Sequence, residues 1–251
     1  MMKETETFLR TEEKFDLSEE QAQAFLKRVE PYIVPDVYPT YTLHSLYYDT
    51  DSYAMIANCL AHPMYREKLR LRSYGDPVEG KPVYVEIKKK FHGLGQKRRT
   101  AILYQKGIED TDVFAHLPSS QIGQEIASSA ARYDLSPAVF VAYDRQAFTD
   151  ETGMLRLTMD RNLTFRTSQL SLYEVGPSHH LLHAPQVLME IKLAGSYPLW
   201  LVQALTALHL YPSSFSKYGE IFIQLNQYKT PLQAQQINYH TKETNLCSAQ
   251  Y

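Results

Sequence analysis

Cationic and apolar residues alternate along one short segment of the chain, residues 65–73. Every second residue there is positively charged: Arg66, Lys68, Arg70 and Arg72. Leu69 and Leu71 lie between them, and a period of two predicts a β-strand with one cationic and one apolar face. Neighbouring cations on such a face are about 6.5–7 Å apart and repel each other by roughly 2–2.5 kcal/mol at an effective dielectric constant of ~20. The row therefore predicts an anionic partner.

The same alternation recurs in five further segments. Their ranges are 10–15, 83–90, 139–147, 155–160 and 187–193. Each places charged or polar residues on one face: Arg10, Glu12, Lys14, Tyr84, Glu86, Lys88, Lys90, Tyr143, Arg145, Arg156, Thr158, Asp160, Glu190 and Lys192. A half-solvated sheet explains any one of these strands. Six faces rich in Arg and Lys, with interspersed carboxylates, favour a cavity lined for a polyanion and a divalent metal.

Helices are predicted in three places. Ser18 and Gln21 form a capping box, which starts a helix that ends before Pro31. A second helix is expected over 119–132 and a third after Pro198. With another strand over 42–48, the fold class is α+β: an antiparallel barrel with a charged interior, whose apolar outer face is covered by helices.

Length and composition indicate one domain, residues 1–229, followed by a polar, poorly ordered tail over 230–251. The net charge of −2 argues against a general nucleic-acid binder. Cys59 and Cys247 lack the spacing of a zinc site. The N-terminus has no apolar signal segment and no apolar run approaches ~18 residues, so no transmembrane segment is expected and the expected location is cytoplasmic.

Two motifs are weaker than they look. Residues 75–82 resemble a phosphate-binding P-loop, but Pro82 replaces the hydroxyl residue that holds magnesium, so we expect a hairpin turn. His179, His180 and His183 lie in a segment bounded by prolines, where solvent exposure is more common than metal binding.

The charged faces suit phosphoryl chemistry. Arg grips phosphate through paired hydrogen bonds and Lys supplies point charge, while a carboxylate can hold a bridging divalent ion. Glu190 is the first candidate metal ligand, with Glu86 and Glu12 next; the alternative is that these glutamates balance the interior cations. Ser216 and Lys217 precede the apolar run 221–223, which places Lys217 at the edge of a predicted strand near phosphate.

The order of these short motifs resembles the VTC domain, from about Phe8 to Tyr228. The matching positions are Lys14, Arg70, Arg72, Val85-Glu-Ile-Lys88, Lys97-Arg-Arg99, Tyr143-Asp-Arg145, Arg156, Glu190-Ile-Lys192 and Ser216-Lys217. This is the catalytic domain of the vacuolar transporter chaperone polyphosphate polymerases, found also as stand-alone bacterial proteins. It belongs to the triphosphate tunnel metalloenzymes, related to the CYTH proteins, so the resemblance implies an eight-stranded antiparallel tunnel.

The resemblance also implies roles for individual residues. The expected catalytic residues are Lys14, Arg70, Arg72, Lys88, Arg145 and Glu190. The expected triphosphate- or polyphosphate-binding residues are Arg66, Lys68, Lys97, Arg98, Arg156, Lys192, Ser216 and Lys217. Tyr143 is expected near the nucleotide. The expected ligands of Mn²⁺ or Mg²⁺ are Glu190, Glu86 and Glu12.

The implied activity is transfer of the γ-phosphoryl group of ATP to a growing inorganic polyphosphate, an ATP:polyphosphate phosphotransferase. A metal-dependent inorganic tripolyphosphatase or nucleoside triphosphatase, and a non-catalytic polyphosphate-binding module, are the alternatives. The expected partners are ATP and orthophosphate or polyphosphate, without nucleic acid, and with a membrane protein for product export. The SPX domain and membrane segment of the eukaryotic relatives have no counterpart in this sequence.

Overall fold

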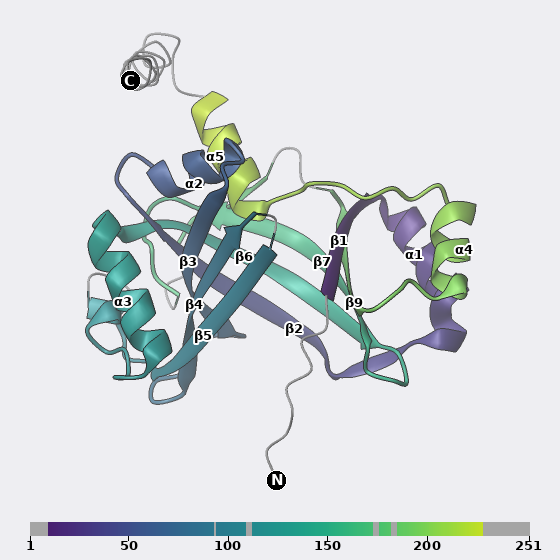
Figure 1. The fold of residues 1–251 in the computed structure, drawn as a ribbon, viewed down its shortest axis with the longest axis horizontal. Helices are drawn as coiled ribbons and strands as arrows, with labels where there is room; N and C mark the ends of the chain where they lie inside the picture. Colours follow the sequence, from purple (N-terminus) through teal and green to yellow (C-terminus); the bar gives the residue numbers. More distant parts are fainter. Residues whose placement is uncertain (1–9, 93, 109–111, 173–175, 182–184, 228–251) are drawn as a thin grey trace, which may run out of the picture.

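The computed structural model describes residues 10–92, 94–108, 112–172, 176–181 and 185–227 (Figure 1). The expected tail, Cys247 and His183 lie outside these residues. Within them no helix is both long and apolar enough to cross a membrane.

One curved antiparallel sheet dominates the structure (Figure 1). Its strands are β1 (Arg10–Leu17), β2 (Val34–Asp49), β3 (Tyr65–Tyr74), β4 (Pro82–Phe91), β5 (Leu94–Leu103), β6 (Ser136–Thr149), β7 (Leu155–Arg166), β8 (His179–His180) and β9 (Val187–Ala194). Eight strands follow the order β1-β9-β7-β6-β2-β3-β4-β5, and β8 pairs with β7. The path ends at β1 and β5, which are not hydrogen-bonded to each other in the described part of the chain. The expected tunnel-like α+β fold is confirmed.

The three expected helices are present: α1 (Glu19–Val29), α3 (Gln121–Tyr133) and α4 (Leu199–Ala207). The capping box at the start of α1 is formed as predicted, because Ser18 and Gln21 each accept a hydrogen bond from the other's backbone N–H. Two further helices were not predicted, namely α2 (Ala54–Leu60) and α5 (Lys217–Gln227).

Helix α5 corrects the interpretation of residues 216–223. Lys217 does not lie at a strand edge, because the apolar run after it is helical. Ser216 Oγ accepts a hydrogen bond from Gly219 N at 3.2 Å and starts the helix. The buried side chains of this helix, Tyr218, Ile221 and Gln224, are spaced three residues apart, so its buried face follows a helical period.

The hairpin turns expected at 75–80 and 150–153 connect β3 to β4 and β6 to β7. The segment that resembles a P-loop is thus a strand-to-strand connection without a following helix. Gly75 and Gly80 have φ of 75° and 74°, which is the left-handed conformation that glycine adopts at little cost.

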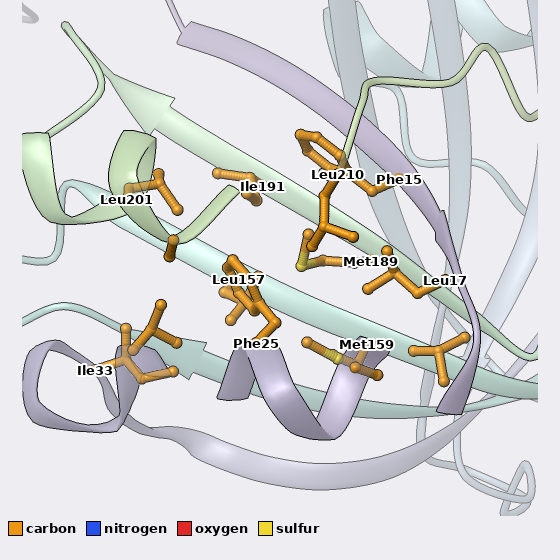
Figure 2. Close-up of a cluster of buried hydrophobic side chains, with 14 of the residues drawn as sticks. Phe15, Leu17, Phe25, Ile33, Leu157, Met159, Met189, Ile191, Leu201 and Leu210 are labelled. Carbon is orange, nitrogen blue, oxygen red and sulfur yellow. The ribbon is translucent and has the colours of Figure 1, made fainter. Parts of the chain in front are cut away.

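The buried apolar residues that the structure describes form three separate clusters rather than one core. The first lies under α1 and α4, against β1, β7 and β9 (Figure 2). The second lies under α3, against β2, β3, β4 and β5. The third packs under α2 and α5, which lie beside each other (Figure 1). Helices therefore cover the outer face, as the strand pattern predicts, and α2 and α5 also cover one end of the inner face.

Candidate functional site: a polar interior

Here the polar interior means the charged inner face of the curved sheet. Side chains from strands that are not neighbours in the sheet meet there. Lys88 Nζ of β4 is 3.3 Å from Glu12 Oε1 of β1, and Arg72 Nη2 of β3 donates to Tyr143 Oη of β6 at 3.1 Å. These contacts show that the charged faces converge, since successive side chains of each strand alternate between inside and outside.

Glu86 of β4 is the anion that the cations of β3 and β5 surround. Arg70 Nη2 lies 2.8 Å, Lys97 Nζ 2.7 Å and Arg72 Nη1 3.8 Å from its carboxylate oxygens. Burial alone would raise the pKa of Glu86, but Arg70, Arg72 and Lys97 outweigh it and lower the pKa to about 2. Glu86 is thus the counter-ion of three cations. Binding of a metal by Glu86 stays a prediction.

The remaining cations of β3 are also held by polar partners. Arg72 donates to Ser45 Oγ through Nε at 3.1 Å and Nη2 at 3.0 Å. Lys68 Nζ donates to Ser216 Oγ at 2.9 Å, at the start of α5. Burial lowers the pKa of Lys68. The row therefore runs from α5 toward the other end of the interior with each cation fixed in place.

Two candidates do not join the others in the interior. Arg98 is the clear correction: its Nη1 donates to Glu125 Oε2 of α3 at 3.0 Å, on the outer face of the sheet. Successive side chains on a strand point to opposite faces of the sheet, so Arg98 must point outward because Lys97 points inward. Arg66 lies at the end of the β3 row, where Nη1 is 2.7 Å from His62 Nδ1, just after α2.

A second buried anion lies on β7. Asp160, 3% exposed, accepts from Arg145 Nε at 2.6 Å and Nη2 at 2.8 Å, and from Lys217 Nζ at 2.6 Å. Burial would raise the pKa of Asp160, but Lys217 and Arg145 lower it. Asp160 thereby ties β6 to the first turn of α5.

Glu190 lies beside a further group of cations. Lys192 Nζ is 2.5 Å from Glu190 Oε1 and 3.9 Å from Glu12 Oε2. Lys14 stands directly opposite Glu190 on β1. Burial would raise the pKa of Glu190, but Lys192, Arg145 and Lys14 hold the pKa well below its usual range. Glu190 is therefore ionised at neutral pH.

Among the described residues, Glu190 and Glu12 are the pair that fits a divalent metal. Glu190 and Glu12 both face Lys192, so one cation already joins two carboxylates there. A divalent ion that takes oxygen ligands from these carboxylates and from phosphate suits this arrangement. The described residues contain no ready-made group of three or more His, Cys, Asp or Glu ligands, so the remaining ligands would come from phosphate and water.

Direct contacts join α5 and the segment before it to one end of the interior. Lys14 Nζ donates to the carbonyl of Phe215 at 2.9 Å, and burial lowers the pKa of Lys14. The ring of Tyr47 stacks on Tyr218 of α5 at 4.7 Å. Burial raises the pKa of Tyr47, but Arg70 and its neighbours outweigh it and lower the pKa to about 7.

The opposite end carries Arg156. Its Nε donates to Asp36 Oδ2 at 2.9 Å and its Nη2 to Tyr41 Oη at 3.2 Å. The interior thus has cations along its whole length, from Lys14 and Lys68 near α5 to Arg156 at the other end.

Sequence reasoning left three residues of this interior unassigned. Asp160, Tyr47 and Ser45 each hold an interior arginine. The alternation already put Asp160 on the charged face with Arg156 and Thr158, but it did not indicate that Asp160 pairs with Arg145. Tyr47 and Ser45 lie in a strand with few charges, so only the pairing with β3 reveals them.

Comparison with known proteins agrees with this fold. The family model of the VTC domain matches residues 9–225. A solved Bacillus halodurans structure, provisionally named an adenylate cyclase, superimposes with a TM-score of 0.50 at 11% identity, covering 83% of this chain and 94% of that one. A Vibrio parahaemolyticus structure with the same provisional name gives 0.47 at 13% identity, with 86% and 98% covered. No curated protein matches the sequence.

The curved sheet and its charged interior form a tunnel-like α+β fold. Because the family model spans most of the sequence, the chain belongs to the VTC domain family. This family handles phosphate or triphosphate and generally depends on divalent metals.

Acid should destabilise this interior in a defined pH range. The folded pKa of Glu86 is about 2 against an ordinary value of 4.5, which corresponds to about 3 kcal/mol of stability at neutral pH. Because the folded pKa is lowered, this stability is present above pH ~4.5 and is lost as the pH falls toward 2. Urea unfolding at several pH values measures it.

The variant Glu86→Gln identifies the residue responsible. It should be less stable than wild type at pH 7 and should lose less free energy of unfolding between pH 5 and pH 3. Glu151→Gln, in the exposed turn after β6, is the control and should follow the wild-type profile. Parallel profiles for wild type and Glu86→Gln would contradict the assignment of Glu86 as the principal counter-ion.

Proposed function

We propose that this chain is a metal-dependent polyphosphate polymerase, which transfers the γ-phosphoryl group of ATP to a growing polyphosphate chain and releases ADP. The observation that carries the proposal is the convergence of cations from eight elements on one interior within a VTC domain. These cations are Lys14, Lys68, Arg70, Arg72, Lys88, Lys97, Arg145, Arg156, Lys192 and Lys217.

The charge pattern suits a chain of phosphates better than a single one. The cations of β3 follow one another at every second residue, from Lys68 beside α5 to Arg72. Same-face neighbours on a strand are about 6.5–7 Å apart, so one extended triphosphate can contact several of them. Glu86 and Asp160 keep the neighbouring guanidinium groups oriented, which reduces the reorganisation needed on binding.

Phosphoryl transfer requires positioning and charge neutralisation more than a protein nucleophile. In the proposed reaction, the bond from the γ-phosphorus to the β,γ-bridging oxygen breaks, and a bond to a terminal oxygen of the polyphosphate forms. That acceptor oxygen is already ionised, so no side chain has to remove a proton from it. Lys88, Arg145 and Lys217 would bind the negatively charged oxygens around the reacting phosphorus.

Glu190 and Glu12 would hold Mn²⁺ or Mg²⁺ beside Lys14 and Lys192. Such an ion, when bound, neutralises charge on phosphate oxygens and helps to orient them. The chain's own lysines would serve the same electrostatic purpose along the rest of the substrate.

We further propose that the reaction takes place in the cytoplasm, where ATP is abundant. Export of the product would then require a membrane-protein partner.

Incubation of the purified protein with ATP and Mn²⁺, followed by gel analysis for polyphosphate, tests the proposal. A ladder of polyphosphate together with ADP is the expected result, and EDTA should abolish it. ADP with orthophosphate alone would instead indicate a triphosphatase. Binding of tripolyphosphate without turnover in any divalent metal would indicate a binding module.

A further inference from the structure

Three tyrosines form a continuous aromatic group at the end of the interior away from α5. Tyr41 of β2 and Tyr74 of β3 have ring centroids 5.7 Å apart, and Tyr74 and Tyr84 of β4 are also 5.7 Å apart, in an edge-to-face arrangement. Arg99 of β5 lies over the Tyr84 ring at 4.8 Å and donates to Tyr74 Oη at 3.3 Å. Four adjacent strands thus contribute to one aromatic and cationic surface.

Binding of a polyanion does not account for the exposure of these rings. Tyr74 is 46% exposed, and Tyr41 and Tyr84 are partly exposed, so the group is not a closed apolar core. A phosphate chain has no apolar face that would pack against exposed rings. Aromatic rings beside arginine are, in contrast, the surface on which nucleic-acid bases stack.

The distance between Arg72 and these tyrosines matches the distance between the α-phosphate and the base of a nucleotide. Tyr84 stands directly opposite Arg72 in the pairing of β3 with β4, where paired side chains are about 5 Å apart. Tyr74 follows Arg72 by two residues on the same face, about 6.5–7 Å along the strand. An α-phosphate at Arg72 would leave about one ribose between itself and these rings.

The other candidate for contact with a base is Tyr143, and the structure makes it a less suitable one. Tyr143 is 4% exposed, and both Lys217 Nζ and the Arg145 guanidinium lie over its ring, at 4.3 Å and 5.4 Å. Its hydroxyl accepts from Arg72. Stacking of a base on this ring would require these cations to move.

We propose that Tyr41, Tyr74 and Tyr84 form a stacking subsite for the base of a nucleoside triphosphate. The triphosphate would then extend from Arg72 toward Lys68 and α5. This inference rests on the proposed function for its substrate, and it adds how the protein distinguishes a nucleotide from an inorganic phosphate chain. Stacking recognises the ring faces that all bases share, so it favours nucleotides as a class.

Calorimetric binding of ATP and of inorganic tripolyphosphate, both in EDTA to prevent turnover, tests the subsite. Tyr74→Leu and Tyr84→Leu should each weaken ATP binding by about fivefold to 100-fold, the usual effect of removing one base-stacking ring. Tripolyphosphate binding should change by less than about twofold, because its cations remain. Tyr74→Phe keeps the ring and should restore ATP binding. Tyr38→Leu, 75% exposed at the start of β2, is the matched control.

The outcomes separate this inference from the proposed function. Equal losses for ATP and tripolyphosphate would show that the tyrosines only shape the interior, and unchanged ATP binding would show that no base stacks there. Either result overturns the subsite even if wild type makes polyphosphate. A selective loss of ATP binding supports the subsite even if wild type makes none, in which case the polymerase proposal alone fails.

Discussion

Replacing Glu190 with glutamine is expected to lower metal-dependent turnover by about 100-fold or more, comparable with the loss of one preorganised electrostatic contact. Glutamine keeps the shape of the side chain and removes the charge that, with Glu12, would hold the divalent ion. Steady-state turnover of ATP across a titration of Mn²⁺ or Mg²⁺ measures the effect.

In the absence of metal, the Glu190→Gln substitution should not weaken the binding of tripolyphosphate. Lys14, Arg145 and Lys192 surround Glu190, so removal of its charge leaves more uncompensated positive charge for a polyanion. Tripolyphosphate should therefore bind the variant as tightly as wild type or more tightly in EDTA. Glu125→Gln, which alters a glutamate on the outer face, is the control and should leave turnover unchanged.

Two results would count against this role of Glu190. Turnover within about threefold of wild type would show that no essential ion depends on Glu190. A variant that fails to fold would show that Glu190 is needed as a structural counter-ion, and Glu12→Gln would then test the metal separately, because Glu12 is more exposed.

Asp160→Ala is expected to cause the largest loss of stability. The change leaves Arg145 and Lys217, both largely buried, without their shared anion. Breaking a buried ion pair by removal of one partner costs about 3–5 kcal/mol. At about 2–4 °C per kcal/mol for a chain of this size, the melting temperature should fall by roughly 10 °C. Urea unfolding gives the free energy directly.

Asp36→Ala is the matched control. Asp36 also accepts from an arginine, at 2.9 Å, but both side chains are more exposed, so the expected cost is below about 1 kcal/mol. Tripolyphosphate should stabilise Asp160→Ala more than wild type, because a bound anion replaces part of the missing charge. A loss below 1 kcal/mol for Asp160→Ala would contradict the view that Asp160 fixes Arg145 and Lys217.

The alternation of charge predicts the strands and the inner face well. The reason is physical: a period of two fixes which side chains share a face, and four like charges on one face need a common anion. The three predicted helices follow equally local signals, namely a capping box and apolar residues at helical spacing.

Local pattern is insufficient where partners are distant in the sequence. Arg98 lies in a run of three cations, and its outward direction becomes clear only from Glu125 on α3. Residues 221–223 are three consecutive apolar side chains, which fit a helix or a strand until Tyr218 and Ile221 are seen to form the buried side of α5. Asp160 meets Lys217 across 57 positions of sequence, which no short motif can reveal.

Because the centre of the sheet is polar, the described part of the chain has three peripheral apolar clusters and no common one. Each part of the sheet is thus held mainly by the helices over its own apolar cluster. Neighbouring parts are joined by strand pairing and by ion pairs in the interior. A phosphate chain in the interior would contact all of these parts of the sheet at once. A bound substrate would then link these parts of the sheet to one another. We expect the complex to unfold as a single cooperative unit, whereas the free protein can unfold locally, one part of the sheet at a time.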